Sequence, residues 1–453
     1  MMCMKKTMVL ALIGLFIGAC AVPSIVDEHQ NRSMRIDDLR KGFHPPNTCD
    51  VVIDFECDTD DGFDEDSSHS YPRYGQSNEN KKWTFMFYDD ADFQGYDPLT
   101  ESYGGISFAE AAYSGENVDV IVIRDTYYGP ATMWYIDEHH QLEKLEDMGE
   151  INMGDAASLH HLVDYGKNKF PADRYVLALY NHGGGMWGAC IDDTSNGDLL
   201  TMDEMQRALH ETGGVDLLCF TAPCYMGALE SAYELKDCVD VYVGSEEKSG
   251  YTCWHDPMAV LFETLHENPD ISTNDLVSQI IDLIEASAKT NIRWGFLITM
   301  SAIRTDSMQE LGASLDQLSM YFNDHFNDTI KDIMKARRRT KEVGSHRQTI
   351  DLLDFIQRYT DIEKDPVISE HLTTITEALN EAIIKECHRW WYRRDHGLSI
   401  YFPEISLFYG YTHRYDEPGY GLDFPQDTHW DEFLRNYYAY ELELFRIPFV
   451  QFS

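Results

Sequence analysis

The chain has 453 residues, 43% of them hydrophobic and 13% aromatic, so it is long enough to bury a large core in one or more globular domains. Its 78 Asp and Glu residues outnumber 36 Lys and Arg residues, which gives a formal net charge of -42 at pH 7. A protein this acidic repels phosphate, so we expect no nucleic-acid partner; basic substrates and cations would be attracted.

The first twenty residues have the pattern of an export signal. Lys5 and Lys6 precede an apolar run at 8–16, which is too short for a stable membrane span, and small residues follow before Cys20. The segment resembles a bacterial lipoprotein signal, which predicts a signal peptide at 1–20, a lipid on Cys20, and membrane attachment at the cell envelope through that lipid. An ordinary secretory signal is the alternative, and either one directs the protein out of the cytoplasm.

Residues 21–80 are polar and poorly periodic, and we expect a tether or loosely packed leader there. Asp58, Asp60, Gly62 and Asp64 partly match a calcium-binding loop, but the Glu at the twelfth position of such loops is missing. We therefore expect no required cofactor, and calcium stays open as a ligand. The ten cysteines include no CxxC pair and no zinc-ligand spacing, so no metal site is predicted. If a local disulfide forms, the pair Cys49 and Cys57 is the expected one, because these cysteines are close together in the sequence.

Strands and helices alternate from residue 81 to about residue 260. Short apolar runs predict strands, and apolar residues at helical spacing predict helices. In chain order we expect strands at 83–88 and 118–123, a helix at 157–169, a strand at 175–180, a helix opened by the capping box Thr201–Glu204, a strand at 215–220, a helix at about 227–235 and a strand at 239–243. This order predicts an α/β domain at 81–260 with a mostly parallel sheet covered by helices on both faces.

Residues 261–453 are predicted to form a largely helical C-terminal region with added strands. Helical periodicity occurs at 276–286, 307–322, 329–338 and 372–386. Trp390–Tyr392 and 398–402 are expected to be a packed strand region. The basic run Arg337–Arg339, followed by Lys341, is expected to be a solvated helix end or an exposed cleavage site rather than a binding site.

Two of the predicted strands end at residues that can do chemistry. His182 follows the strand at 175–180 and precedes Gly183–Gly185, while Cys224 follows the strand at 215–220. A cysteine nucleophile needs a base and N–H donors for the oxyanion, and these two segments contain both. Either residue alone is usually structural, but ligands bind at the carboxyl ends of strands in open α/β sheets. The pair therefore suggests a cysteine hydrolase.

Several ordered sequence blocks between about 82 and 440 resemble the clostripain family of cysteine peptidases, relatives of caspases and gingipains. The blocks are Trp83–Tyr88 with Ala91–Asp92, Met153–Asp155 with Leu159, Asn181–Gly185, Leu200–Glu204, Phe220–Gly227, Gly244–Glu247 and Gly397–Pro403. The resemblance implies a caspase-like fold and an endopeptidase acting on peptides or proteins. It also implies an acyl-enzyme on Cys224, a leaving amine protonated by His182, and an oxyanion held by the N–H groups of Gly183 and Cys224.

The chain departs from the family pattern just before the cysteine. The family commonly has an Asp two residues before the nucleophile that helps select Arg or Lys at P1, whereas this chain has Thr221, Ala222 and Pro223 there. Thr221 and Ala222, together with Glu246 and Glu247, become the candidate substrate-binding residues, and the P1 preference stays open. The alternative function is a catalytically inactive envelope lipoprotein that binds a ligand on the same fold.

Family members often cleave themselves at a basic residue between the His and Cys segments. Here Arg207 is the only Lys or Arg between His182 and Cys224, and it falls inside a predicted helix. A helix must open locally before a protease can cut it. We therefore expect a single chain that needs no cleavage between these two segments. We also expect the protein to be a monomer.

Overall fold

The computed structural model describes residues 81–93, 112–249, 254–290, 298–344, 347–363, 365–404, 415 and 421–445. The predicted signal and Cys20, the tether with its partial calcium loop, and the Cys49–Cys57 pair lie outside the described residues.

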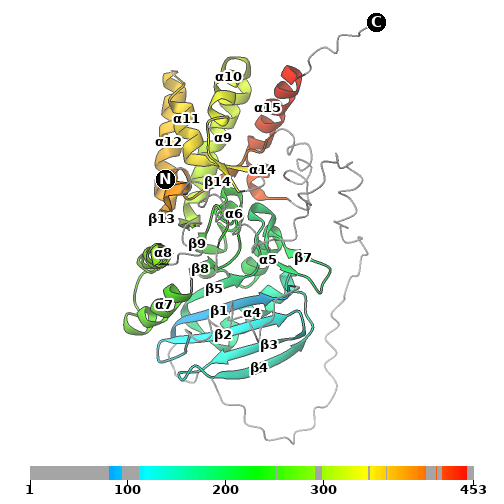
Figure 1. Ribbon diagram of the computed structural model, residues 1–453, viewed down its shortest axis with the longest axis vertical. Coiled ribbons are helices and arrows are strands. Elements are labelled where there is room, and N and C mark those ends of the chain that lie inside the picture. The colour runs from blue at the N-terminus through cyan, green and yellow to red at the C-terminus, as the bar shows by residue number, and fades with distance from the viewer. Residues whose placement is uncertain are drawn as a thin grey trace, which may run out of the picture. The chain divides into compact units, whose positions relative to one another are not determined.

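A nine-stranded sheet forms the centre of the described chain, in the strand order β13-β10-β9-β8-β5-β1-β2-β3-β4 (Figure 1). Its strands are β1 Lys81–Ala91, β2 Val118–Thr126, β3 Gly129–Ile136, β4 Leu142–Gly149, β5 Ala172–Tyr180, β8 Val215–Phe220, β9 Val239–Gly244, β10 Thr299–Arg304 and β13 Ile383–His388. The five central strands, from β9 to β2, are parallel, and antiparallel strands extend the sheet at both ends. The predicted mostly parallel sheet is therefore confirmed.

Both faces of the sheet are buried because the central strands are apolar on both sides. In β1, Met86 and Tyr88 belong to one hydrophobic cluster, while Phe85 and Phe87 belong to the other. Adjacent side chains of a strand point to opposite faces, so a strand covered on both sides has an unbroken apolar run. Phe85 meets Phe262 of the covering helix α7 His255–Glu267, with ring centroids 5.0 Å apart.

Helices cover both faces, as the sequence predicts. The first cluster contains residues of α4 Ala156–Lys169, α5 Met202–Glu211 and α6 Leu229–Glu234; the second contains residues of α7 His255–Glu267 and α8 Thr273–Thr290. The capping box is present: the Thr201 hydroxyl accepts from the Glu204 N–H, and the Glu204 carboxylate accepts from the Thr201 N–H at 3.0 Å.

The C-terminal region adds a helical group and a small sheet. Figure 1 places the helices on the side of the large sheet away from β3 and β4. They are α9 Met308–Asp324, α10 Phe326–Arg337, α11 Leu352–Thr360, α12 Pro366–Ala382, α14 Asp423–Asp427 and α15 Trp430–Phe445. The small sheet contains β11 Glu342–Val343, β12 Thr349–Asp351 and β14 Ser399–Tyr401. The Ser399 N–H donates to the Gly227 carbonyl at 2.8 Å, which joins this sheet to the segment after β8.

Three predictions in the C-terminal region were wrong in part. The helix expected at 372–386 ends at Ala382, because the next residues form β13 and pair with β10; the adjacent isoleucines Ile383 and Ile384 favour a strand. Trp390–Tyr392 is a 3₁₀ turn rather than a packed strand. Trp390 and Trp391 are 59% and 56% exposed and stack on each other at the surface.

The third correction concerns the basic run. Helix α10 does end there, and Arg338 and Arg339 are exposed. Arg337, however, is only 6% exposed, and its Nε donates to the Phe402 carbonyl at 2.9 Å. The expected solvated helix end therefore holds for two of the three arginines, while Arg337 packs the helix onto the chain after β14.

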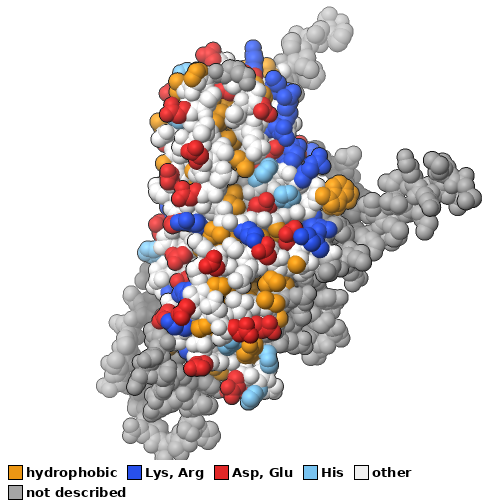
Figure 2. Space-filling view, turned by 90° about the vertical axis from the view of Figure 1, so that its left-hand side faces the viewer, with side chains coloured by type: hydrophobic (Ala, Val, Ile, Leu, Met, Phe, Trp, Pro, Cys, Tyr) orange, Lys and Arg blue, Asp and Glu red, His pale blue; other side chains and the backbone are white. Residues whose placement is uncertain are grey.

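The surface carries both signs of charge, which Figure 2 shows across one face of the molecule. None of the helices that the structure describes has the length and apolar character needed to cross a bilayer.

Candidate active site

The His182 segment begins at the carboxyl end of β5, in the middle of the large sheet. Asn181 leaves the strand with φ at 146°, and its amide Nδ2 donates to the Asp90 and Ile191 carbonyls, each at 3.0 Å. The His182 carbonyl accepts from the Cys190 N–H at 3.0 Å. These bonds anchor the segment to the end of β1 and to the two-stranded sheet of β6 Ala189–Asp192 and β7 Asp198–Leu200.

The Cys224 segment begins at the carboxyl end of β8, the strand next to β5. The Thr221 N–H and hydroxyl both donate to the Leu179 carbonyl, at 3.0 and 2.8 Å, so the side chain of Thr221 is buried against β5. The Tyr225 N–H donates to the Glu247 carbonyl at 3.0 Å. The turn that carries Cys224 is thus held between β5 and the segment after β9.

Gly183 is the point at which the two segments touch. A Cβ atom on Gly183 would lie 2.4 Å from the Cys224 carbonyl oxygen and 2.6 Å from the Cys224 nitrogen. Real Cβ atoms do not approach backbone atoms this closely, so the contact needs a glycine. The structure therefore brings together the backbones of the two segments that the sequence analysis paired.

The His182 ring lies in a partly buried setting. The Phe93 ring is its aromatic neighbour, with centroids 5.7 Å apart. Burial lowers the pKa of His182 below its usual value of about 6.5, and the negative charge of Asp193 opposes part of that shift. The imidazole is therefore neutral at neutral pH and can accept a proton.

Cys224 differs from the other cysteines that the structure describes. Cys190, Cys219, Cys238 and Cys387 are buried, whereas Cys224 is partly exposed. Burial raises the pKa of the Cys190 and Cys219 thiols well above the usual range, and that of Cys238 to about 12. The thiolate is the reactive form, so these buried cysteines are poor nucleophiles. Among the described cysteines, the accessible one is the one at the proposed site.

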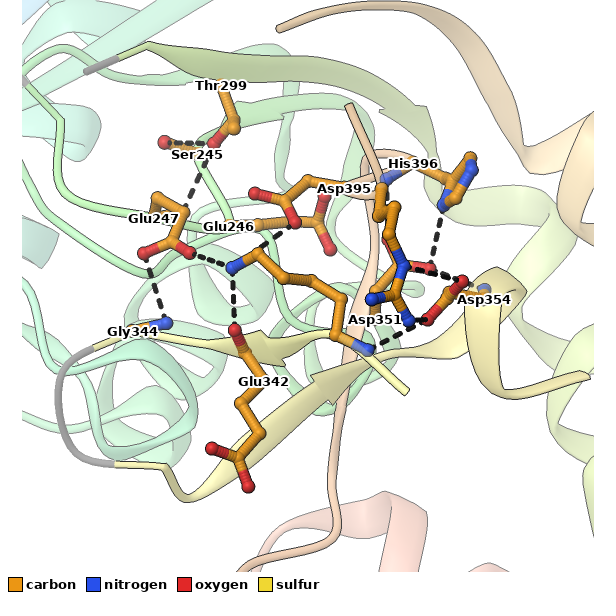
Figure 3. A network of polar contacts seen from close by, with 12 residues as sticks. Ser245, Glu246, Glu247, Thr299, Glu342, Gly344, Asp351, Asp354, Asp395 and His396 are labelled. Carbon is orange, nitrogen blue, oxygen red and sulfur yellow. Dashed lines mark hydrogen bonds and ion pairs between the residues drawn. The ribbon is translucent and has the colours of Figure 1, made fainter. Parts of the chain in front are cut away.

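Glu247, expected at a substrate pocket, is bonded to the C-terminal region instead (Figure 3). Its Oε1 lies 2.6 Å from the Lys341 ammonium, and its Oε2 accepts from the Gly344 N–H at 3.0 Å. Burial alone would lower the pKa of Lys341, but the carboxylates of Glu247 and Asp395 raise it above the usual value. Glu247 and Lys341 therefore form a charged pair.

Glu246 points into the same network and is 1% exposed. Its Oε2 accepts from the Gly397 N–H at 2.6 Å. Burial, followed by the charges of Asp351 and Asp395, raises the pKa of Glu246 well above its usual range, which favours the protonated acid. Burial also raises the pKa of Asp395 to about 7. Glu246 is thus a buried acid that holds the chain before β14.

Sequence reasoning missed the partners of these glutamates. The sequence shows Lys341 only as part of a basic run, and no pattern marks Asp395. Lys341 precedes β11, far along the chain from β9, so periodicity gives no hint of the contact. The sequence feature that could have predicted the contact is charge, because a lysine beside a short strand in a strongly acidic chain has many acids available as partners.

Comparisons with known proteins identify the family and the fold of this chain. A sequence profile of the clostripain family matches residues 105–437, more than half of the chain. Clostripain from Hathewaya histolytica is 31% identical over 194 residues; the match covers 35% of this chain and 37% of clostripain, so the chain spans well under half the length of this relative.

Two solved structures share the fold at low sequence identity. One is an inactive zymogen C11 protease from Parabacteroides distasonis, with a TM-score of 0.57 and 18% identity. The other is a secreted C11 cysteine protease from Bacteroides thetaiotaomicron in complex with an irreversible peptide inhibitor, with a TM-score of 0.56 and 15% identity. Each similarity covers 79% of this chain and 99% of the other. The predicted sheet with helices on both faces and a C-terminal helical region is the fold of these proteases.

Proposed function

Because this chain belongs to the clostripain family of cysteine peptidases, we propose that it is an endopeptidase with Cys224 as the nucleophile and His182 as the general acid and base. The observation that carries the proposal is the backbone contact at Gly183, which joins the two segments. The neutral His182 imidazole and the partial exposure of Cys224 support it.

The proposed reaction has two steps. In the first, the Cys224 sulfur attacks the peptide carbonyl, and the thiol proton passes through His182 to the leaving amine. The oxyanion forms beside the backbone N–H groups of Gly183 and Cys224, two residues whose backbones are in close contact. In the second, water gives a proton to His182 and attacks the acyl-enzyme, which releases the acid product and restores the thiol.

We propose that a basic P1 side chain is not strongly required. Thr221 has no carboxylate and its hydroxyl is bonded to Leu179, while the Glu247 carboxylate is paired with Lys341. Thr221 and Ala222 then border the pocket through their position beside Cys224, and Glu246 and Glu247 act by holding the surrounding segments. A carboxylate facing the substrate is the strong way to select a cation. Glu247 is paired with Lys341, and Glu246 is buried and favours the protonated acid.

A labelling experiment tests the function. A peptidyl probe with a thiol-reactive group should label the wild type and the Cys238→Ala variant, because Cys238 is buried, but not Cys224→Ala. Mass spectrometry should place the label on Cys224. A folded wild type that is never labelled at Cys224 would instead support the inactive binding protein.

A panel of fluorogenic peptides that differ only at P1 tests the selectivity. We expect kcat/KM for Arg and for uncharged P1 residues to agree within about tenfold, and we expect Cys224→Ala to lower every value by at least about a thousandfold. Cleavage confined to Arg and Lys would contradict the proposed P1 pocket but not the catalytic pair.

We also propose that the chain is anchored in the bacterial cell envelope by a lipid on Cys20, on the strength of the pattern around that residue. Cells given a labelled fatty acid should incorporate it into the wild type but not into Cys20→Ala, and Cys3→Ala should behave as the wild type. Incorporation into Cys20→Ala would contradict the anchor.

A further inference from the structure

We propose that an aromatic and basic patch at the end of α10 binds an anionic membrane surface, with two tryptophans at the level of the lipid headgroups. The patch consists of exposed side chains from two distant parts of the chain: Lys335, Arg338 and Arg339 at the end of α10, and Trp390, Trp391 and Arg393 at the 3₁₀ turn. The basic run by itself predicts only a solvated helix end, and the structure adds the two tryptophans to it.

Two contacts bring these parts of the chain together. The Arg394 guanidinium donates from Nη2 to the Arg339 carbonyl, and the Lys341 ammonium lies 5.5 Å from the centre of the Tyr392 ring. Tyr392 and Arg394 flank Arg393, so the end of α10 and the 3₁₀ turn form one surface. Figure 2 shows Lys and Arg side chains gathered along one edge of the molecule, with hydrophobic side chains beside them.

The two tryptophans are the exposed ones among the tryptophans that the structure describes. Trp390 and Trp391 are 59% and 56% exposed, and their ring centroids are 3.4 Å apart. By contrast, Trp83, Trp254 and Trp430 are at most 2% exposed. Contact between large apolar groups and water is unfavourable, and contiguous exposed apolar surface marks interaction sites. Covering two indole rings requires a partner that is itself partly apolar.

The bases of the patch keep their charge available to a partner. None of the four forms an ion pair with a carboxylate in the described ranges, whereas Arg337 pairs with Glu342 and Arg394 pairs with Asp354. Acids outnumber bases by 78 to 36 in this chain, so a group of exposed bases without acidic partners is unexpected on composition alone. Four such positive charges on one surface attract anionic groups.

An anionic bilayer supplies both kinds of contact that the patch needs. Indole rings are enriched at the headgroup level of membranes, and clusters of Lys and Arg are attracted to anionic lipids. A purely acidic peptide would neutralise the bases but would leave the two rings in water. The inference does not depend on the lipid proposed on Cys20, although such an anchor would keep the patch near a membrane.

The net charge of -42 does not prevent this binding at moderate salt. Exposed charges farther apart than the Debye length, which is about 8 Å at 0.15 M, are largely screened from each other. Headgroups that touch the patch therefore interact more strongly with its bases than with acids elsewhere on the molecule.

Binding is tested with the full chain carrying Cys20→Ala, so that no lipid can attach there. The protein should sediment with vesicles of phosphatidylcholine that contain about 30% phosphatidylglycerol, and it should bind pure phosphatidylcholine at least about tenfold less. Raising the salt from about 0.1 M to about 0.5 M should weaken the binding by about tenfold. No binding to the anionic vesicles would overturn the proposal. Equal binding to both kinds of vesicle would also overturn it, because an apolar segment rather than the bases would then hold the chain.

A triple variant tests the bases. Lys335→Gln, Arg338→Gln and Arg393→Gln, combined in the same Cys20→Ala chain, should weaken binding to the anionic vesicles by at least about tenfold. The three side chains are exposed and make no ion pair with a described acid, so the temperature of unfolding should change little.

A second triple variant controls for net charge. Lys82→Gln, Lys144→Gln and Lys289→Gln remove the same charge from exposed positions outside the patch, and binding should stay within about twofold. If the two triple variants weaken binding equally, net charge rather than the patch governs it, and the proposal fails.

Fluorescence tests the tryptophans. Anionic vesicles of brominated lipids should quench the fluorescence of the Cys20→Ala protein, and the further changes Trp390→Ser and Trp391→Ser should remove most of this quenching. Quenching that persists would show that these two rings do not meet the membrane. Binding of poly-glutamate instead of vesicles, if the Lys335, Arg338 and Arg393 triple variant abolishes it, would overturn the membrane assignment in favour of an acidic polypeptide.

Discussion

Gly183 controls the distance between the histidine and cysteine segments. In Gly183→Ala, the new Cβ would collide with the backbone of Cys224, which cannot move as a flexible side chain can. We expect kcat/KM to fall by roughly a hundredfold, because a shift of about 1 Å in a catalytic group has effects of this size.

Gly184→Ala is the matched control for that experiment. Its Cβ would meet no atom closer than 3.5 Å, and Gly184 has a negative φ of -114° that alanine can adopt. Activity and the temperature of unfolding should stay near those of the wild type. If the two variants lose activity equally, general disturbance of the glycine turn, rather than the Cys224 contact, would be the cause.

The charge of Asp193 should set the acid limit of activity. His182 must be neutral to accept the thiol proton. Its lowered pKa keeps the imidazole neutral at pH values somewhat below the usual histidine pKa. Asp193→Asn removes the charge that opposes this lowering, so the pKa of His182 falls further. The acid limb of kcat/KM, measured from about pH 4 to about pH 8, should move to lower pH. Movement to higher pH, or none, would show that His182 does not govern the limb.

At the scale of elements, Glu247 and Lys341 connect the segment after β9 to β11. The pair is mostly buried, with the side chains of Lys341 and Glu247 22% and 9% exposed. Removing one partner leaves the other charge poorly solvated, so Lys341→Met and Glu247→Gln should each lower stability more than expected from the pair's net contribution. The double variant should lose less stability than the sum of the two single losses. The coupling energy, measured by urea unfolding, should be roughly 0.5–3 kcal/mol.

Lys248→Met serves as the control for this cycle, because Lys248 is next to Glu247 but exposed. It should change stability by less than about 0.5 kcal/mol. If the double variant loses the sum of the two single losses in stability, Glu247 and Lys341 do not interact in solution.

Elements with strong local signals were predictable from the sequence, and elements that depend on distant partners were not. The apolar run of β1 and the Thr201 capping box specify their own structure, and both were confirmed. Strand β4 has the sequence LEKLEDMG and has no fully buried residue at the edge of the sheet. It therefore lacks the apolar run that identifies a buried strand. Strand β13 continues a helical spacing, and pairing with β10 decides its structure.

The candidate site divides in the same way. His182 and Cys224 were predictable because each follows a buried strand of one parallel sheet, and such strands end at one edge. The contacts of Glu246 and Glu247 were not predictable, since Lys341 and Gly397 reach them from the C-terminal region through tertiary packing.

At the scale of the whole molecule, the C-terminal region contacts the segment that carries the proposed nucleophile. Gly344 approaches the Tyr225 ring, where a Cβ would lie 2.9 Å from a ring atom, and Ser399 bonds to Gly227. Both contacts reach the turn that carries Cys224. The C-terminal region therefore braces the cysteine segment, and its removal should disturb the site as well as the fold.

The net charge of -42 makes a prediction for the molecule as a whole. Like charges destabilise a compact state, and salt screens this repulsion, since the Debye length falls from about 30 Å at 0.01 M to about 8 Å at 0.15 M. Raising the salt concentration from about 0.02 M to about 0.3 M should raise the temperature of unfolding. Salt also weakens the attraction between Glu247 and Lys341, which would lower the temperature of unfolding. This pair is partly shielded from solvent, however, and is one pair against a large excess of acids. Tetramethylammonium chloride should give the same rise as sodium chloride, because screening depends on ionic strength and not on which cation is present. A fall in the unfolding temperature with either salt would mean that attractive ion pairs, rather than the excess of acids, dominate the electrostatics of this fold.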